Sequence, residues 1–145
     1  MEKPGDCKRV LFLCTANSCR SQMAEGFLRS LAPDRFEAFS AGTKGTDVHP
    51  LAVRVMEEAG VDISGHSSKT VSVFSAEKFD YVITVCGGSG GSGCPVFTGS
   101  ARERLAWDFP DPAAFRGSAA EVLACFRQVR DAIKHRVEEF IESGV

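Results

Sequence analysis

The sequence predicts a single α/β domain, residues 1–145, in which a parallel sheet is flanked by helices. Two short runs, RVLFLC at residues 9–14 and DYVITVC at residues 80–86, have the apolar content of strands that are covered on both faces. Patterns of helical apolar spacing lie between and after them. This alternation favours parallel pairing through crossover connections, and it places ligand sites beyond the carboxyl ends of the strands.

The other elements follow in order along the chain. FEAFSAG at residues 36–42 alternates apolar and polar residues and predicts a third strand. Amphipathic spacing predicts a helix through Leu31, a second helix that Gly60 ends, and a long closing helix over residues 119–142. The apolar positions of these helices are Met23, Ala24, Phe27, Leu28 and Leu31; Leu51, Ala52, Val55, Met56 and Ala59; and Val122, Phe126, Val129, Ile133, Val137 and Phe140.

The composition limits the classes of function. The net charge of -2 and the isoelectric point of about 5.9 provide no basic footprint for nucleic acid. No apolar run approaches the ~20 residues that span a bilayer, and the first residues lack the apolar core of a signal peptide. We therefore expect a cytoplasmic monomer without membrane association, whose six cysteines are reactive or buried thiols rather than a disulfide framework.

A cysteine and an arginine bracket the junction between the first strand and the first helix. Cys14 and Arg20 have the spacing C-x5-R, and Ser21 follows. Inward-pointing N–H groups and a helix N-terminus can hold a tetrahedral oxyanion there, and Arg20 adds a planar fork of donors. The same field favours the Cys14 thiolate, to which Ser21 can donate. The alternative is a buried cysteine beside an unrelated arginine. The predicted oxyanion-binding residues are Thr15, Ala16, Asn17, Ser18, Cys19 and Arg20.

Six stretches together resemble a known family: LFLCTANSCRSQMAEG, FSAGT, GVDISGHSSK, DYVITVCG, CPVF and DFPDPAAFRG. In this order, over nearly the whole chain, they are similar to arsenate reductases built on the low-molecular-weight tyrosine phosphatase fold, in the thioredoxin-coupled branch. The resemblance implies a four-stranded parallel sheet flanked by helices, arsenate as the substrate, a role in arsenic resistance, and thioredoxin as the external reductant in place of a resident cofactor.

The remaining cysteines separate reductase from phosphatase. Reducing arsenate takes two electrons, which a pair of thiols supplies by forming a disulfide. Cys86 ends a predicted strand near Cys14, and Cys94 follows eight positions later. The resemblance implies that these two cysteines complete the reaction in relay; otherwise they are incidental thiols. We interpret Cys19 as accessory, and the other two cysteines, Cys7 and Cys125, as structural.

The resemblance also makes Asp111, in the segment DPAAF, the general acid for the departing oxygen. Phosphatases of this fold often carry aromatic residues after the Asp-Pro pair, whereas Ala113 and Ala114 stand here, which favours a small inorganic substrate. Two alternatives stay open. One is a low-molecular-weight protein tyrosine phosphatase that uses Cys14, Arg20 and Asp111, an activity that could also persist as a side reaction. The other is a non-catalytic oxyanion-binding redox module.

Two features depart from the family. Residues 87–93 read GGSGGSG, a composition typical of flexible linkers, so we expect little order there. Lys69 stands where some relatives place an acidic ligand of a potassium ion, so we expect no potassium site, with Lys69 reaching Glu25 and Asn17 or pointing into solvent. The other matching positions are Ser40 and Ser67. The three histidines lack ligand spacing, so no metal centre is expected.

Overall fold

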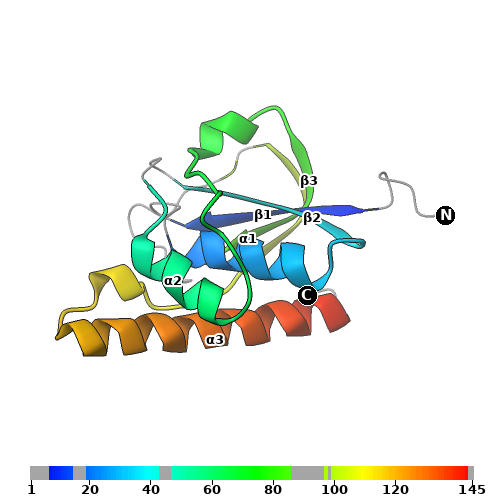
Figure 1. Ribbon diagram of the computed structural model, residues 1–145. Helices are drawn as coiled ribbons and strands as arrows, with labels where there is room; N and C mark the ends of the chain where they lie inside the picture. Colours follow the sequence, from blue (N-terminus) through cyan, green and yellow to red (C-terminus); the bar gives the residue numbers. More distant parts are fainter. Residues whose placement is uncertain (1–6, 15–18, 43–46, 86–96, 98, 144–145) are drawn as a thin grey trace.

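The computed structural model describes residues 7–14, 19–42, 47–85, 97 and 99–143. Within them, β1 (Lys8–Cys14), β2 (Phe36–Gly42), β3 (Lys78–Thr84) and β4 (Ser100–Ala106) form one sheet in the order β2-β1-β3-β4 (Figure 1). All three pairings are parallel; β1 is central and pairs with β2 along its whole length. The predicted fold class is confirmed: a domain with a four-stranded parallel sheet and flanking helices.

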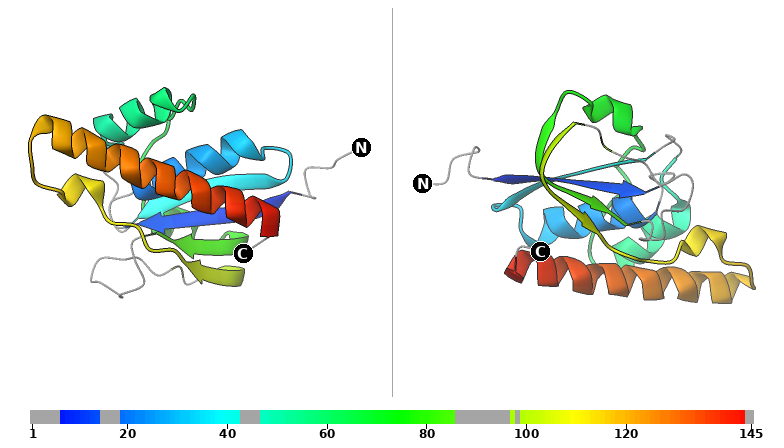
Figure 2. Two further views of the ribbon diagram at one scale, coloured as in Figure 1. Left: turned by 90° about the horizontal axis from the view of Figure 1, so that it is seen from below. Right: turned by 180° about the vertical axis from the view of Figure 1, so that it is seen from behind.

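The three α-helices cover one face of the sheet. These are α1 (Arg20–Leu31), α2 (Pro50–Glu58) and α3 (Ala119–Ser143), and two views show them on the same side (Figures 1 and 2). The short 3-10 helix η2 (Val71–Phe74) lies on the opposite side. Gly60, with φ +83, takes the left-handed conformation just after α2, which confirms the predicted stop. A second 3-10 helix, η3 (Pro112–Ala114), precedes α3.

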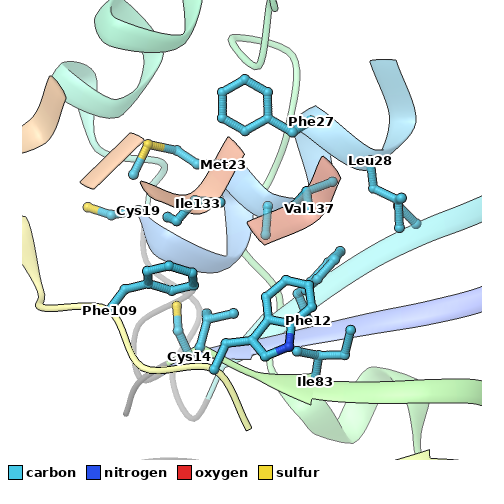
Figure 3. Packing of buried hydrophobic residues seen from close by; sticks show 14 of the residues in the cluster. Phe12, Cys14, Cys19, Met23, Phe27, Leu28, Ile83, Phe109, Ile133 and Val137 are labelled. Atoms are coloured by element: carbon cyan, nitrogen blue, oxygen red, sulfur yellow. The ribbon is translucent and has the colours of Figure 1, made fainter. Parts of the chain in front are cut away.

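Each face of the sheet has its own apolar core. Beneath the helices, Val10 and Phe12 of β1 pack against α1 and α3, and Figure 3 shows this packing around Phe12, Phe27 and Val137. On the other face, Leu11 and Leu13 pack against a smaller cluster that includes Phe79. Because successive side chains of a strand point to opposite faces, the part of β1 that lies between the two cores must be apolar at every position. Its residues 10–14, VLFLC, are all buried.

The structure corrects two predictions that were made from the apolar periodicity. β4, with the sequence SARERLA, has no apolar run and was not predicted as a strand from its own pattern; the resemblance alone implied a fourth strand. It is a sheet edge with largely exposed residues, so burial did not select its composition. Leu31 on α1 is 42% exposed, although helical spacing placed it on the core face.

Of the predicted elements, β3 ends at Thr84, and Cys86 lies outside the described residues. Segment 87–93 lies outside them as well. Among the helices that the structure describes, none has the length and apolar character needed to cross a membrane.

Candidate active site

Cys14 lies at the carboxyl end of β1, the central strand, where the sequence placed it. Its partner in the register is Gly42 of β2, and on the other side Val85 donates its backbone N–H to the Leu13 carbonyl at 2.9 Å. The thiol is 2% exposed, and its Sγ lies 2.8 Å from the Ser21 Oγ. The structure therefore brings together the predicted nucleophile and the hydroxyl predicted to support it.

The N-terminus of α1 faces this end of the sheet. Cys19 occupies the N-cap position with no side-chain capping hydrogen bond, and the first turn of the helix contains no acidic residue. The partial positive charge of the helix end is therefore not neutralised from within α1. Cys19 itself is 3% exposed and belongs to the core cluster, and Figure 3 shows its side chain at the same end of the cluster as Cys14 and Phe109.

Arg20 and Asp111 meet at this site although 91 residues separate them. The Arg20 side chain is 8% exposed; its Nη1 donates to the Phe109 carbonyl at 3.2 Å, and its Nη2 lies 3.7 Å from the Asp111 Oδ2. Asp111 also accepts a hydrogen bond from the Ala113 backbone N–H, at 3.0 Å, as the N-cap of η3. The short helix thus holds a half-exposed carboxylate beside Arg20.

Hydrogen bonds connect the first turn of α1 to the segment that contains His66 and Ser67. The fully buried side chain of Gln22 donates from Nε2 to the Ser67 carbonyl at 3.1 Å, and its Oε1 lies 3.0 Å from His66 Nδ1. Because the amide nitrogen is committed to Ser67, the amide oxygen must accept from His66, which places a proton on Nδ1. Burial lowers the pKa of His66, while the Glu25 carboxylate opposes this shift. The imidazole is thereby held toward its neutral form.

The predicted contacts of Lys69 to Glu25 and Asn17 stay predictions. Its ammonium donates to the Ser67 carbonyl at 2.7 Å, and Asn17 lies outside the described residues. The Glu25 carboxylate is bound by the Ser40 hydroxyl and by Arg29, whose Nη2 is 2.6 Å from it. A guanidinium thus already neutralises this buried acid. The expectation that the protein has no potassium site stays a prediction. Within the described ranges, no group of three or more His, Cys, Asp or Glu could hold a metal ion.

Sequence reasoning missed three polar residues near the site. Gln22 and His66 form the hydrogen bond described above, and His49 caps α2 by accepting from the Leu51 N–H at 3.1 Å. Burial lowers the pKa of His49, and the Asp111 carboxylate opposes this shift. A polar Gln22 between apolar helix positions was the one available signal, because the histidine contacts span distant segments.

Several predicted site residues are not described by the structure. Thr15, Ala16, Asn17 and Ser18 of the oxyanion loop, and both relay cysteines, Cys86 and Cys94, fall in the undescribed ranges. Their roles stay predictions. Of the cysteines interpreted as structural, Cys125 is half-buried against the helix-side core, and Cys7 points its Sγ at the Asp34 carbonyl, 3.4 Å away.

Comparison with known proteins identifies a family. The family model described as low molecular weight phosphotyrosine protein phosphatase matches residues 9–143. An arsenate reductase from Halalkalibacterium halodurans is 44% identical over 137 residues, which cover 94% of this chain and 97% of that protein. A glutaredoxin arsenate reductase from Synechocystis is 41% identical over 134 residues, 92% of this chain and 96% of that protein.

Solved structures agree. An arsenate reductase in a phosphate-binding state matches with a TM-score of 0.77 and 40% identity, covering 93% of this chain and 97% of the other. A thioredoxin-dependent arsenate reductase from Corynebacterium glutamicum matches with a TM-score of 0.67 and 28% identity, covering 97% of this chain and 63% of the other.

Proposed function

The chain belongs to the low-molecular-weight phosphotyrosine protein phosphatase family, in which it is an arsenate reductase, and we propose that it reduces arsenate to arsenite through a relay of three cysteines. The observation that carries this proposal is the Cys14 thiol, buried at the end of β1 against Ser21 and beside the positive end of α1. A nucleophile and an oxyanion-binding field then coincide in one place.

The first step forms a bond between Cys14 sulfur and arsenic. The thiolate attacks, an arsenate oxygen departs with a proton from Asp111, and Arg20 with the helix end balances the oxyanion charge. Arg20 now rests against the Phe109 carbonyl and, more loosely, Asp111.

The second and third steps are thiol exchanges. The Cys86 thiolate attacks the Cys14 sulfur, and arsenite leaves with the electron pair of the arsenic–sulfur bond, so arsenic gains two electrons and the two thiols become a disulfide. Cys94 then attacks Cys86, the sulfur of Cys14 departs as a thiolate, and the disulfide passes to Cys86 and Cys94. An external dithiol reduces that disulfide. We propose that this dithiol is thioredoxin, because one similar structure is a thioredoxin-dependent arsenate reductase. Glutaredoxin is the alternative reductant, because another relative is named a glutaredoxin arsenate reductase.

The second candidate function is hydrolysis of phosphotyrosine, because Cys14, Arg20 and Asp111 would serve it equally well and the family bears that name. Against it, the residues that follow Pro112 are the exposed Ala113 and Ala114, whose methyl groups are too small to enclose an aromatic ring. A small tetrahedral anion needs no such enclosure. We therefore expect phosphatase activity only as a side reaction.

One set of assays tests the proposal. The reduced protein is incubated with arsenate, NADPH, thioredoxin and thioredoxin reductase, in parallel with glutathione and glutaredoxin, and NADPH consumption is compared with arsenite formed. Equal molar amounts in the thioredoxin arm support it. Activity only in the glutaredoxin arm would overturn the choice of partner, and no arsenite in either arm, with rapid hydrolysis of an aryl phosphate, would establish a phosphatase instead.

A further inference from the structure

We propose that Phe109 is a positioning residue for the oxyanion site, because it holds the guanidinium of Arg20 and the chain that leads to Asp111. This inference rests on the proposed function, in which Arg20 binds the oxyanion. The backbone carbonyl of Phe109 accepts a hydrogen bond from Arg20 Nη1 at 3.2 Å. Two residues further along the chain, Asp111 places its Oδ2 3.7 Å from Arg20 Nη2. One short segment therefore contacts the cation and carries the acid.

The side chain of Phe109 fixes this carbonyl from the core. Phe109 is 7% exposed, belongs to the helix-side core and packs edge-on against the indole of Trp107, with 6.4 Å between the ring centres. Trp107 is itself held, because its backbone N–H donates to the Thr84 carbonyl at 2.7 Å and the Cζ of Arg136 lies 4.6 Å from its ring centre. Figure 3 shows the Phe109 ring at the same end of the core as Cys14. The anchored ring thus lies beside the nucleophile.

The residue after Phe109 restricts the orientation of the carbonyl. Pro110 follows it, and a residue before proline is confined largely to extended conformations, because the proline ring clashes with the helical one. The same restriction applies to Asp111, which precedes Pro112 and is extended, with φ −83 and ψ 108. Pro110 is exposed, so it acts through chain conformation rather than through packing. The buried ring and the proline restrain the carbonyl from its two sides.

A fixed carbonyl sets the orientation of the guanidinium before the oxyanion binds. The guanidinium is planar and carries five N–H donors in a fixed geometry. The hydrogen bond to Phe109 occupies one donor and limits rotation of the plane. Because the carbonyl is a neutral acceptor, it leaves the positive charge of Arg20 available to the oxyanion. Without this contact, the guanidinium would have to be ordered during binding, which lowers affinity.

The test measures the binding of inorganic phosphate, a tetrahedral anion that requires no electron transfer. Isothermal titration of each reduced protein gives the dissociation constant, at a temperature where circular dichroism shows that the variant is folded. Phe109→Ala removes the ring, and Phe109→Leu keeps an apolar side chain. The matched control is Phe36→Ala: Phe36 is 6% exposed and belongs to the same core, but it lies at the amino end of β2. Arsenite formation is measured on the same preparations.

Phe109→Ala should raise the phosphate dissociation constant and lower kcat/KM for arsenate by about 10- to 100-fold, since a misplacement of about 1 Å can cost about 10²-fold. Phe109→Leu should restore most of both values. Phe36→Ala, although less stable than the unaltered protein, should leave phosphate binding and kcat/KM unchanged. Unaltered phosphate affinity in folded Phe109→Ala would overturn the proposal, as would an equal loss of affinity in Phe36→Ala.

A pair of proline variants tests the same role with the core intact. Pro110→Ala removes no N–H donor and frees the backbone of Phe109, and Pro33→Ala alters another exposed proline outside the site. Phosphate binding should weaken in Pro110→Ala alone. If Phe109→Ala does not fold, this pair decides, and equal affinity in the two proline variants overturns the proposal. If the unaltered protein forms no arsenite, the proposed function fails, whereas phosphate binding still decides the role of Phe109.

Discussion

Two arginines at opposite ends of β1, Arg9 and Arg20, differ in exposure and in the lengths of their contacts. Arg9, near the amino end of β1, donates to the Lys78 carbonyl at 2.7 Å and to Glu77 at 2.9 Å, and its Cζ lies 4.8 Å from the centres of the Phe39 and Phe79 rings. Its side chain is 29% exposed. Arg20, beyond the carboxyl end of the same strand, is 8% exposed, yet its contacts to the Phe109 carbonyl and Asp111 are longer, at 3.2 and 3.7 Å.

The difference between the two arginines bears on the proposed oxyanion site. Burying a charge is costly unless hydrogen bonds and an opposite charge replace the lost water. The more exposed arginine has two short hydrogen bonds and a longer ion pair, 3.6 Å from Glu37, whereas the contacts given above for the more buried one are all 3.2 Å or longer. Arg9 therefore reads as a structural residue, and the longer contacts of Arg20 support the proposal that it binds an oxyanion beside Cys14.

The largest effect should come from removing the thiol at the carboxyl end. Cys14→Ser removes the nucleophile, so arsenite formation should fall by a factor of about 10⁴ or more. The matched control is Cys125→Ser on α3, which lies outside the site and should keep activity within about twofold. Arsenite is measured after incubation with arsenate and excess reductant. Substantial activity in Cys14→Ser would move the chemistry away from this end of the sheet.

Arg20→Met should lower kcat/KM for arsenate by about 10²–10³, because a bidentate, charge-assisted contact to the transition state is lost. The free energy of unfolding should stay the same or rise, since the variant removes a buried charge with long contacts. Steady-state kinetics and urea unfolding of the same preparation give both numbers. A large loss of stability with normal kinetics would make Arg20 a structural residue and erase the contrast with Arg9.

Arg9→Met should have the reverse profile. The loss of two ring contacts and of charge-assisted hydrogen bonds predicts an unfolding free energy lower by about 1–2 kcal/mol, discounted for partial exposure. Activity at a temperature well below unfolding should remain within about twofold. Urea unfolding and arsenite assays check this pair of outcomes. Lost activity in the folded variant would show that the amino end of the sheet takes part in catalysis.

The smallest effect concerns the partly buried His66, which contacts Gln22 of α1. Its pKa is lowered in the folded protein, chiefly by burial, so the unfolded chain binds a proton more readily. Stability should therefore be complete above about pH 6.5 and should decline as the pH falls below that value. Glu25 and Asp62 oppose this trend, and Arg29 and Lys69 reinforce it.

The measurement is urea unfolding at pH 7.5 and pH 5.5. The decrease between the two should be smaller in His66→Gln, which keeps a polar side chain near Gln22 but cannot titrate, than in the unaltered protein. An equal decrease in both proteins would show that His66 is not the source of the pH dependence.

The sequence by itself determined the order and kind of most elements, because their signals are local. The apolar run before Cys14, the alternation in FEAFSAG and the helical spacing over residues 119–142 each report the burial of their own segment. The same holds for the junction from Cys14 to Ser21, where neighbours in sequence are neighbours in space. These residues sufficed to predict the fold class and an oxyanion-binding thiol, whereas the prediction of an arsenate reductase came from the resemblance to a family over nearly the whole chain.

Only the tertiary structure decided which distant residues meet. Periodicity could not show that Asp111 stands 3.7 Å from Arg20, that His66 bonds Gln22, or that Arg104 holds the Phe97 carbonyl. It also could not identify β4 as a strand, since an exposed edge needs no apolar pattern and forms because β3 offers it hydrogen-bonding groups. Such contacts depend on how buried surfaces stack across the whole chain, and local sequence does not specify that stacking.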